Sequence, residues 1–226
     1  MNLCLFDLDG TLIETDSDHA FGEFLVSIGW ADGENFRRRN DAFLSDYQSG
    51  RLDLAAYLDF ATSAWRARPL DEALAVRADF MHQVMAPALR ASAHELVRRH
   101  QQSGDRVAIV TATNEFVTRP IADAFGVDQL IAIRLARDEN GRFDGTALGV
   151  PSFREGKIVR VTQWLGEQGL QREAFERITV YSDSMNDLPL LEWATHPVAT
   201  NPGPELARLA RARGWPILNL FEQQQP

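Results

Sequence analysis

The sequence is poor in cysteine: its single one, Cys4, has no partner for an intramolecular disulfide, so we expect a reducing compartment. Because Cys4 lies in an apolar run, it is expected in the core and not as a nucleophile. Residues 3–6 are too short for the apolar segment of a signal peptide, and no stretch approaches the length of a membrane span. We therefore expect a cytoplasmic protein that makes no membrane contact.

Positive charge is also scarce, since 23 lysines and arginines stand against 32 acidic residues and give a net charge of -9. A phosphate backbone would be repelled, and residues 37–39 are the only tight basic cluster, so we expect no nucleic-acid partner. At 45% hydrophobic residues the chain is too apolar for disorder. Its 226 residues suit one core with an inserted subdomain, and residues 223–226 are expected to be frayed.

Three short runs are apolar at consecutive positions: residues 3–6 (LCLF), 107–110 (VAIV) and 178–181 (ITVY). This pattern is typical of strands buried on both faces of a parallel sheet, and helical stretches separate the runs. The sequence therefore predicts an α/β fold with a doubly wound parallel sheet. Each run ends in polar residues, first Asp7, then Thr111, then Asp183. Because ligands bind outside the carboxyl ends of such strands, these residues are expected to converge.

Asp7 and Asp9 have period-2 spacing, so in an extended segment both side chains point to one side, and Gly10 allows a tight turn after them. Two acids that face one point require a cation or a shared proton. Mg²⁺ fits, because it takes one or two carboxylates and completes its coordination with water and phosphate oxygens, and Asp183 would supply the other carboxylate. Lys157 is the best candidate to offset the remaining charge, and the alternative is a solvated helix lysine.

Other polar residues favour structural roles. The five histidines show no metal-ligand spacing, so all are interpreted as structural or exposed: His19, His82, His94, His100 and His196. The Asn-Gly pair at residues 140–141 indicates a hairpin turn and not a calcium loop.

With these motifs in place, the sequence resembles the haloacid dehalogenase superfamily of phosphohydrolases. DLDGT (residues 7–11) matches the nucleophile motif of that family, Thr111 its second motif, Lys157 its third, and DSMND (residues 183–187) its fourth. The order of the motifs looks most like the phosphoserine-phosphatase-like branch, which carries a helical cap between the first two motifs. The resemblance implies that the core domain comprises residues 1–14 and 88–226 and that residues 15–87 form the cap. Helical spacing of apolar residues within 15–87, broken by glycine and proline, independently predicts four or so short helices there.

The resemblance also implies the chemistry. Asp7 would attack phosphorus to form an aspartyl phosphate, and Asp9 would act as the general acid and base. Asp7, Asp9 and Asp183 would hold Mg²⁺. The residues expected to bind the phosphate or orient the ligands are Thr111, Ala112, Lys157, Asn186 and Asp187.

The substrate is expected to be a small-molecule phosphate monoester. Phosphoserine phosphatases use a cap glutamate, where this chain has Asp16, and a cap arginine, where an ungapped count reaches Ala61. If Asp16 and Asp59 both face the pocket, they favour a positive amine and give a carboxylate no partner, so histidinol phosphate fits better than phosphoserine. Phosphoserine phosphatase remains the alternative, and a phosphotransferase or a non-catalytic phosphate-binding module are alternatives of another class.

Overall fold

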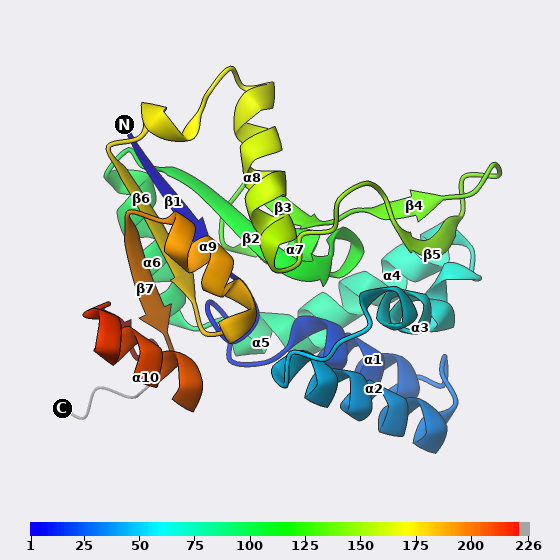
Figure 1. The fold of residues 1–226 in the computed structure, drawn as a ribbon. Helices are drawn as coiled ribbons and strands as arrows, with labels where there is room; N and C mark the ends of the chain where they lie inside the picture. The colour runs from blue at the N-terminus through cyan, green and yellow to red at the C-terminus, as the bar shows by residue number, and fades with distance from the viewer. Residues whose placement is uncertain (222–226) are drawn as a thin grey trace.

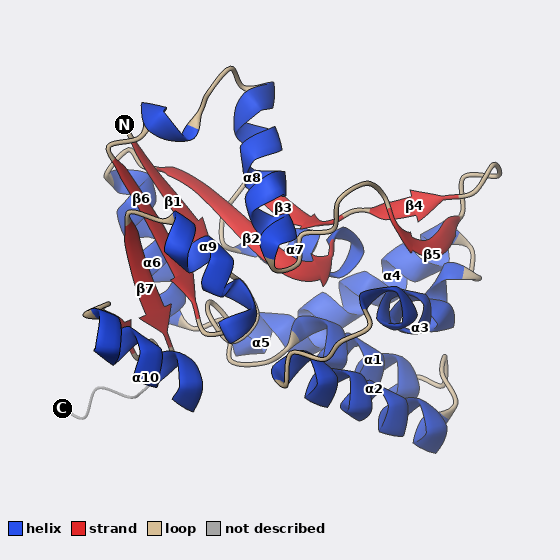
Figure 2. Cartoon of the chain, in the orientation of Figure 1, coloured by secondary structure: helices blue, strands red, loops and turns tan. Residues whose placement is uncertain are grey.

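A computed structural model of the chain describes residues 1–221, and the tail predicted to be frayed, residues 223–226, lies outside them. Six parallel strands form one sheet in the order β3-β2-β1-β6-β7-β8 (Figure 2). Their bounds are β1 Asn2–Phe6, β2 Arg106–Asn114, β3 Leu130–Ile133, β6 Arg177–Ser182, β7 His196–Thr200 and β8 Ile217–Leu218. The predicted α/β fold class, with a parallel sheet and a helical segment after the first strand, is confirmed.

The three predicted strands are the three central strands of this sheet. Cys4 of β1 lies opposite Val107 of β2 on one side and Thr179 of β6 on the other. Strand β2 continues four residues beyond the predicted apolar run, so Thr111 and Asn114 are strand residues and not loop residues. Because all three strands run in the same direction, their carboxyl ends reach the same edge of the sheet.

Alternate residues of β1 enter two separate cores, as the pleat of a strand requires. Cys4 and Phe6 pack among buried residues of α6 (Ala91–Gln102) and α7 (Glu115–Ala124). Leu3 and Leu5 pack on the other face against α8 (Glu155–Glu167), α9 (Leu188–Trp193) and α10 (Pro204–Arg213). The helices therefore cover both faces of the sheet (Figure 1), and the prediction that Cys4 is buried in the core is confirmed.

A helical segment follows β1, as predicted. It contains α1 (Ser17–Ser27), α2 (Gly33–Gln48), α3 (Leu54–Arg66) and α4 (Leu70–Phe80), then a π-helical turn (Met81–Met85) and α5 (Ala86–Ala88). The helical path therefore runs through Pro87, where the sequence suggested a break. Proline is tolerated in the first turn of a helix, and Pro87 occupies that position in α5.

Strands β4 (Leu135–Arg137) and β5 (Phe143–Ala147) form a separate antiparallel hairpin, whose turn contains the predicted Asn-Gly pair. The hairpin packs on α3, where Phe143 meets Trp65 edge to face with ring centroids 5.3 Å apart. Trp65 also stacks on Phe116 of α7 at 4.0 Å. Two short 3₁₀ turns, Arg172–Ala174 and Met185–Asp187, complete the described elements. No helix within residues 1–221 is both long enough and apolar enough to cross a bilayer.

Candidate active site

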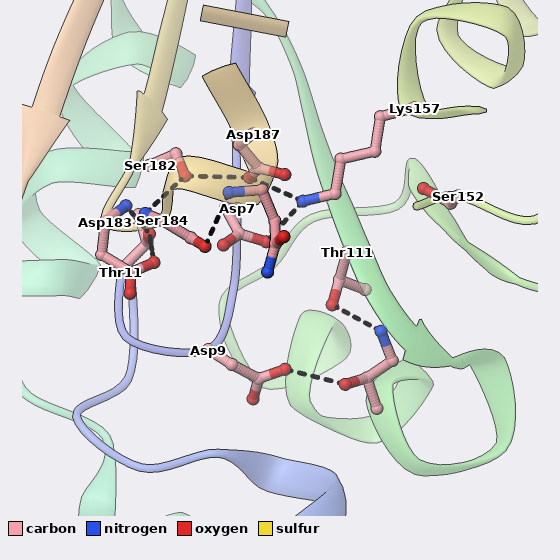
Figure 3. Close-up of polar contacts among 12 residues, drawn as sticks. Asp7, Asp9, Thr11, Thr111, Ser152, Lys157, Ser182, Asp183, Ser184 and Asp187 are labelled. Atoms are coloured by element: carbon pink, nitrogen blue, oxygen red, sulfur yellow. Dashed lines mark hydrogen bonds and ion pairs between the residues drawn. The ribbon is translucent and has the colours of Figure 1, made fainter. Parts of the chain in front are cut away.

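The carboxyl ends of β1, β2 and β6 meet at one edge of the sheet, and the polar residues that follow them face one another there (Figure 3). This edge brings together the core residues predicted from the sequence, namely Asp7, Asp9, Thr111, Ala112, Lys157, Asp183, Asn186 and Asp187. A cavity is lined by Asp7, Asp9 and Thr111 on one side and by residues of α1, α2 and α3 on the other.

Lys157 is the only lysine of the sequence, and it is fully buried. Its Nζ donates to Asp7 Oδ1 at 2.9 Å and to Asp187 Oδ2 at 2.7 Å. Burial would lower the pKa of this amine, but the carboxylates of Asp187 and Asp7 outweigh it, so the pKa is raised and the lysine stays charged. The alternative of a solvated helix lysine is therefore wrong.

Asp7 and Asp9 have different hydrogen-bond partners, although only one residue separates them. Whereas Asp7 accepts from Lys157, Asp9 accepts from the backbone N–H of Ser17 at 2.7 Å and from Thr113 Oγ1 at 2.9 Å. Burial raises the pKa of Asp7 to about 7, and the nearby lysine opposes the rise. Burial, and then the charge of Asp16, raise the pKa of Asp9 to about 7 as well. Near neutral pH, Asp9 can therefore both hold and release a proton.

Asp183 is fixed by the turn that follows β1. Thr11 Oγ1 donates to Asp183 Oδ1 at 3.0 Å and accepts from the backbone N–H of Asp183 at 3.1 Å. Gly10 lies against the same carboxylate with φ +72°, and a Cβ there would overlap Asp183. The position therefore needs glycine both for its backbone angle and for the close approach.

The donor set suits a hard cation. Burial raises the pKa of Asp183 well above its usual value, and the charges of Asp7 and Asp187 add to the rise, so the site has more negative charge than Lys157 offsets. Asp187 Oδ1 is buried with no hydrogen-bond partner among residues 1–221. Within the same residues no three histidine, cysteine or acidic side chains form a complete metal cage. A cation that takes two carboxylates and fills its other positions with water and phosphate oxygens fits this arrangement.

At the end of β2, Thr111 and Ala112 line the cavity together with Thr113. The backbone N–H of Thr113 donates to Thr111 Oγ1 at 3.1 Å. Thr113, which positions the Asp9 carboxylate, was not singled out from the sequence. Thr113 lies two residues after Thr111, and residues at that spacing on a strand share a face. This spacing could have predicted that Thr113 faces the site as Thr111 does.

Asn186 connects the sheet side of the site to the inserted helices. Its Nδ2 donates to the backbone carbonyl of Tyr47, near the end of α2, at 2.9 Å. Arg154 donates to the carbonyl of Gly50 and lies with Nε 3.4 Å from Asn186 Oδ1. Asn186 therefore holds the end of α2 against the core, and its role toward a ligand stays a prediction.

Asp16 lines the cavity and also caps α1, because its Oδ1 accepts from the backbone N–H of His19 at 2.8 Å. Burial raises the pKa of Asp16, and the charge of Asp18 adds to the rise. His19 lines the cavity too, with Nε2 2.8 Å from Asp41 Oδ1. The pair with Asp41 is compatible with the interpretation of His19 as structural or exposed, and any role toward a ligand is untested.

Aromatic rings form the opposite wall of the cavity. Tyr57 and Phe43 meet edge to face with centroids 5.5 Å apart. The Tyr57 hydroxyl donates to Asp18 Oδ2 at 2.6 Å, and Asn114 Nδ2 donates to Asp18 Oδ1 at 3.2 Å. The hydrogen bond to Asp18 fixes the Tyr57 ring. No sequence motif indicated this contact.

Asp59 does not line the cavity, so the condition that both Asp16 and Asp59 face the pocket is not met. It is mostly exposed and forms an ion pair with Arg66 at 2.5 Å. Asp59 lies two positions after Tyr57, and residues at that spacing point in different directions on a helix. Arg66 is held by this pair, and Arg68 lies over the ring of Trp30. Among the described residues, no arginine lines the cavity.

Comparison with known proteins agrees with the geometry. The family model for haloacid dehalogenase-like hydrolases matches residues 4–192. The chain belongs to this family. It lies in the phosphoserine-phosphatase-like branch and is a phosphoric monoester hydrolase. Members of the family typically use Mg²⁺.

Among curated relatives of this hydrolase, a histidinol-phosphatase from Neisseria meningitidis serogroup C is 40% identical over 96% of this chain and 98% of its own. A phosphoserine phosphatase from Mycobacterium tuberculosis is 29% identical over 94% of this chain and 68% of its own. A crystal structure from Bordetella pertussis superposes with a TM-score of 0.92 at 46% identity, covering 97% of this chain and 99% of that one. A substrate-bound phosphoserine phosphatase shares the fold, with a TM-score of 0.67 at 17% identity over 96% and 91% of the two chains.

Proposed function

We propose that this phosphatase hydrolyses a phosphate monoester that carries an amine and no carboxylate, with histidinol phosphate as its substrate. The observation that carries the proposal is the lining of the cavity, in which Asp16 lies beside Asp9. None of the described residues that line it is an arginine or a lysine. An ammonium group would find a carboxylate there, whereas a buried substrate carboxylate would have no cationic partner. The 40% identical relative from N. meningitidis, named a histidinol-phosphatase, supports the same substrate.

The aromatic wall supports the proposal as well. Phe43 and Tyr57 present ring surface to the cavity, and the hydrogen bond from Tyr57 to Asp18 holds one of these rings in place. A planar imidazole could pack against such rings, and an ammonium is attracted to their faces. Asp59 has no part in recognition, because it pairs with Arg66 outside the cavity.

The proposed reaction has two displacements at phosphorus. In the first, an oxygen of Asp7 attacks, the bond from phosphorus to the ester oxygen breaks, and the leaving alkoxide takes the proton of Asp9. In the second, Asp9 accepts a proton from water as the water oxygen attacks, and the bond from phosphorus to Asp7 breaks. Thr113 and the Ser17 amide orient Asp9 for both transfers.

The other residues bind and balance charge in this proposal. Thr111 and the backbone of Ala112 would hold the phosphoryl oxygens, while the charge of Lys157, shared between Asp7 and Asp187, would screen the incoming dianion. The side chains of Asp7 and Asp183 and the backbone carbonyl of Asp9 would hold Mg²⁺, which would neutralise charge on the phosphoryl oxygens. Asp187 would keep Lys157 in position.

A substrate panel tests the proposal. Phosphate release from histidinol phosphate, phosphoserine and a neutral aryl phosphate should show the highest kcat/KM for histidinol phosphate. Asp16→Asn should lower kcat/KM for histidinol phosphate by roughly tenfold or more and change that for the aryl phosphate much less, because only the amine uses the charge. If phosphoserine were hydrolysed faster than every amine that lacks a carboxylate, the proposed substrate would be wrong.

Transfer of the phosphoryl group to an alcohol instead of water remains the second candidate. It follows from the same first displacement, so phosphate release alone does not distinguish the two. Product analysis with added acceptor alcohols would do so, and we expect free phosphate to remain the main product.

A further inference from the structure

The wall of the cavity that α2 forms contains one buried amide. Four residues of this helix line the cavity at spacings of three and four, which places them on one helix face: Asn40, Phe43, Leu44 and Tyr47. The other three present rings or an aliphatic side chain, whereas Asn40 presents a polar group and exposes only 4% of its surface. Because buried polar groups require hydrogen-bond partners, each end of this amide needs one.

One end of the amide is bound within the protein. Asn40 Nδ2 donates to the backbone carbonyl of His19, in the first turn of α1, at 2.9 Å. Since a carbonyl can only accept, this contact fixes which end of the amide is the nitrogen. Gly22 leaves room for the group, because a Cβ there would lie 2.7 Å from Nδ2. Helices α1 and α2 lie side by side (Figure 1), and the amide joins them.

The other end of the amide, Oδ1, has no donor within residues 1–221. It is also not one of the fully buried polar atoms that lack a partner in this part of the chain, so it is open to the cavity that Asn40 lines. The protein therefore holds a fixed acceptor at this wall. A ligand that covered it without offering a donor would leave it desolvated and unpaired.

Asn40 and Asp16 are acceptors held by opposite sides of one residue. Asp16 Oδ1 accepts from the backbone N–H of His19, whereas Asn40 Nδ2 donates to the carbonyl of His19. In a helix the N–H groups point toward the N-terminus and the carbonyls toward the C-terminus, so the two acceptors lie at successive levels along α1. The N-terminal end of α1 contacts Asp9 through the Ser17 amide. Asn40 therefore lies farther from the reacting end of the cavity than Asp16.

We propose that Asn40 determines specificity by accepting a hydrogen bond from a second N–H group of the substrate, distinct from the ammonium that Asp16 binds. This inference rests on the proposed function and narrows it to a phosphate monoester with an N–H donor beyond its amine. An imidazole meets this requirement. Phe43 lies one turn after Asn40 on the same helix face, so an imidazole packed on that ring presents the N–H at its edge toward the amide.

A purely structural role explains less of what is observed at Asn40. The bond to His19 uses Nδ2 and leaves Oδ1 without a partner. A leucine at this position would continue the apolar face of α2 and would leave no acceptor to satisfy. A substrate carboxylate also fits poorly here, since it and Oδ1 are both acceptors.

Two substrates that differ in the second N–H test the proposal. Histidinol phosphate has an amine and an imidazole, whereas phenylalaninol phosphate has the same amine and a ring without an N–H. Wild-type protein should show a kcat/KM for histidinol phosphate at least about tenfold higher than that for phenylalaninol phosphate. Equal values in wild type would overturn the proposal without the use of any variant.

Two substitutions of Asn40 separate the acceptor from the structural bond. Asn40→Leu and Asn40→Asp both remove the donor to His19, but only Asn40→Leu removes the acceptor. Asn40→Leu should lower the ratio of the two kcat/KM values at least about tenfold. Asn40→Asp should keep most of the wild-type ratio, because a carboxyl also accepts and its charge acts on the ammonium of both substrates.

The matched control is Asn35→Leu. Asn35 is exposed on the same helix and lies outside the cavity, so this variant should leave the ratio unchanged. Circular dichroism and the hydrolysis of a neutral aryl phosphate would show that each variant is folded.

The outcomes separate this inference from the proposed substrate class. If wild-type protein hydrolysed phosphoserine fastest, both would be wrong. If wild type preferred histidinol phosphate and Asn40→Leu kept the wild-type ratio, only the role of Asn40 would be wrong. Equal losses in Asn40→Leu and Asn40→Asp would also overturn that role, because they would assign Asn40 to the packing of α1 on α2.

Discussion

Asp7 and Asp9 are separated by one residue, yet Asp7 contacts the lysine and Asp9 contacts neutral donors. This difference suits a nucleophile whose charge a cation balances and an acid that exchanges a proton. We expect Asp7→Asn to lower kcat for an aryl phosphate by roughly a thousandfold or more, since an amide cannot form an acyl phosphate. The fold should survive, because Lys157 keeps its bond to Asp187. Steady-state kinetics measure the loss of kcat, and a thermal melt shows whether the variant is folded. A variant that retained most of its rate would exclude the covalent route.

The buried carboxyl of Asp18 predicts a pH dependence of stability that is independent of any metal. Burial raises its pKa from 3.8 to about 6. The folded state therefore binds this proton more tightly than the unfolded state, so the stabilisation is fully present below about pH 4 and is lost as pH rises through about 6. The shift corresponds to at most about 3 kcal/mol.

Denaturant unfolding of wild type and Asp18→Asn across this range would measure the effect. The free energy of unfolding of wild type minus that of the variant should decrease between about pH 4 and pH 7. The exposed Asp128→Asn is the matched control and should follow wild type throughout. Parallel curves for wild type and Asp18→Asn would show that Asp18 does not titrate in this range.

At the scale of elements, Gly10 in the turn after β1 and Gly29 after α1 form a matched pair of glycines. Gly10 and Gly29 have nearly the same backbone angle, φ +72° and +75°, but a Cβ at Gly10 would overlap Asp183, whereas at Gly29 nothing lies within 4 Å. Gly29→Ala should therefore cost only about 1 kcal/mol of backbone strain. Gly10→Ala should cost more and lower activity as well, because Asp183 must move. Equal losses of stability and equal activities in the two variants would contradict the close approach at Gly10.

The strands that could be predicted from the sequence were those with uninterrupted apolar runs, since burial on both faces leaves a clear pattern. Strand β7 begins with His196 and Pro197, and β8 has only two residues, so neither has that pattern. The core of the site followed from the motifs at the strand ends. The cap side did not, because the direction of the Asp59 side chain depends on helix rotation, which residue counting does not resolve.

The division into a core of residues 1–14 and 88–226 and a cap of residues 15–87 stays a prediction. Contacts across it are polar at one end, where Asn186 and Arg154 bind the backbone near the end of α2, and aromatic at the other, where Trp65 stacks on Phe116. Polar contacts can exchange with water, whereas the aromatic stack would lose buried area. If the cap opens, we therefore expect it to open at the α2 end.

At the scale of the whole molecule, the excess negative charge at the site predicts that a cation stabilises the fold. A ligand that binds only the folded state adds about 2.7 kcal/mol at a concentration of about 100 times its dissociation constant. For a chain of this length that corresponds to a rise in Tm of roughly 5 to 10 °C. Mg²⁺ should produce this rise in wild type, and EDTA should remove both the rise and the phosphatase activity.

Asp183→Asn distinguishes this stabilisation from a general effect of salt. Burial, and then the charges of Asp7 and Asp187, raise the pKa of Asp183. In EDTA at mildly alkaline pH the variant should therefore be more stable than wild type, because those two charges no longer face a third carboxylate. In Mg²⁺ the order should reverse, because the variant lacks one of the two carboxylates that would hold the ion. Thermal melts of both proteins with Mg²⁺ and with EDTA measure the four stabilities. A variant that gained as much from Mg²⁺ as wild type does would show that the ion binds elsewhere, and Asp183 would then have to be assigned another role.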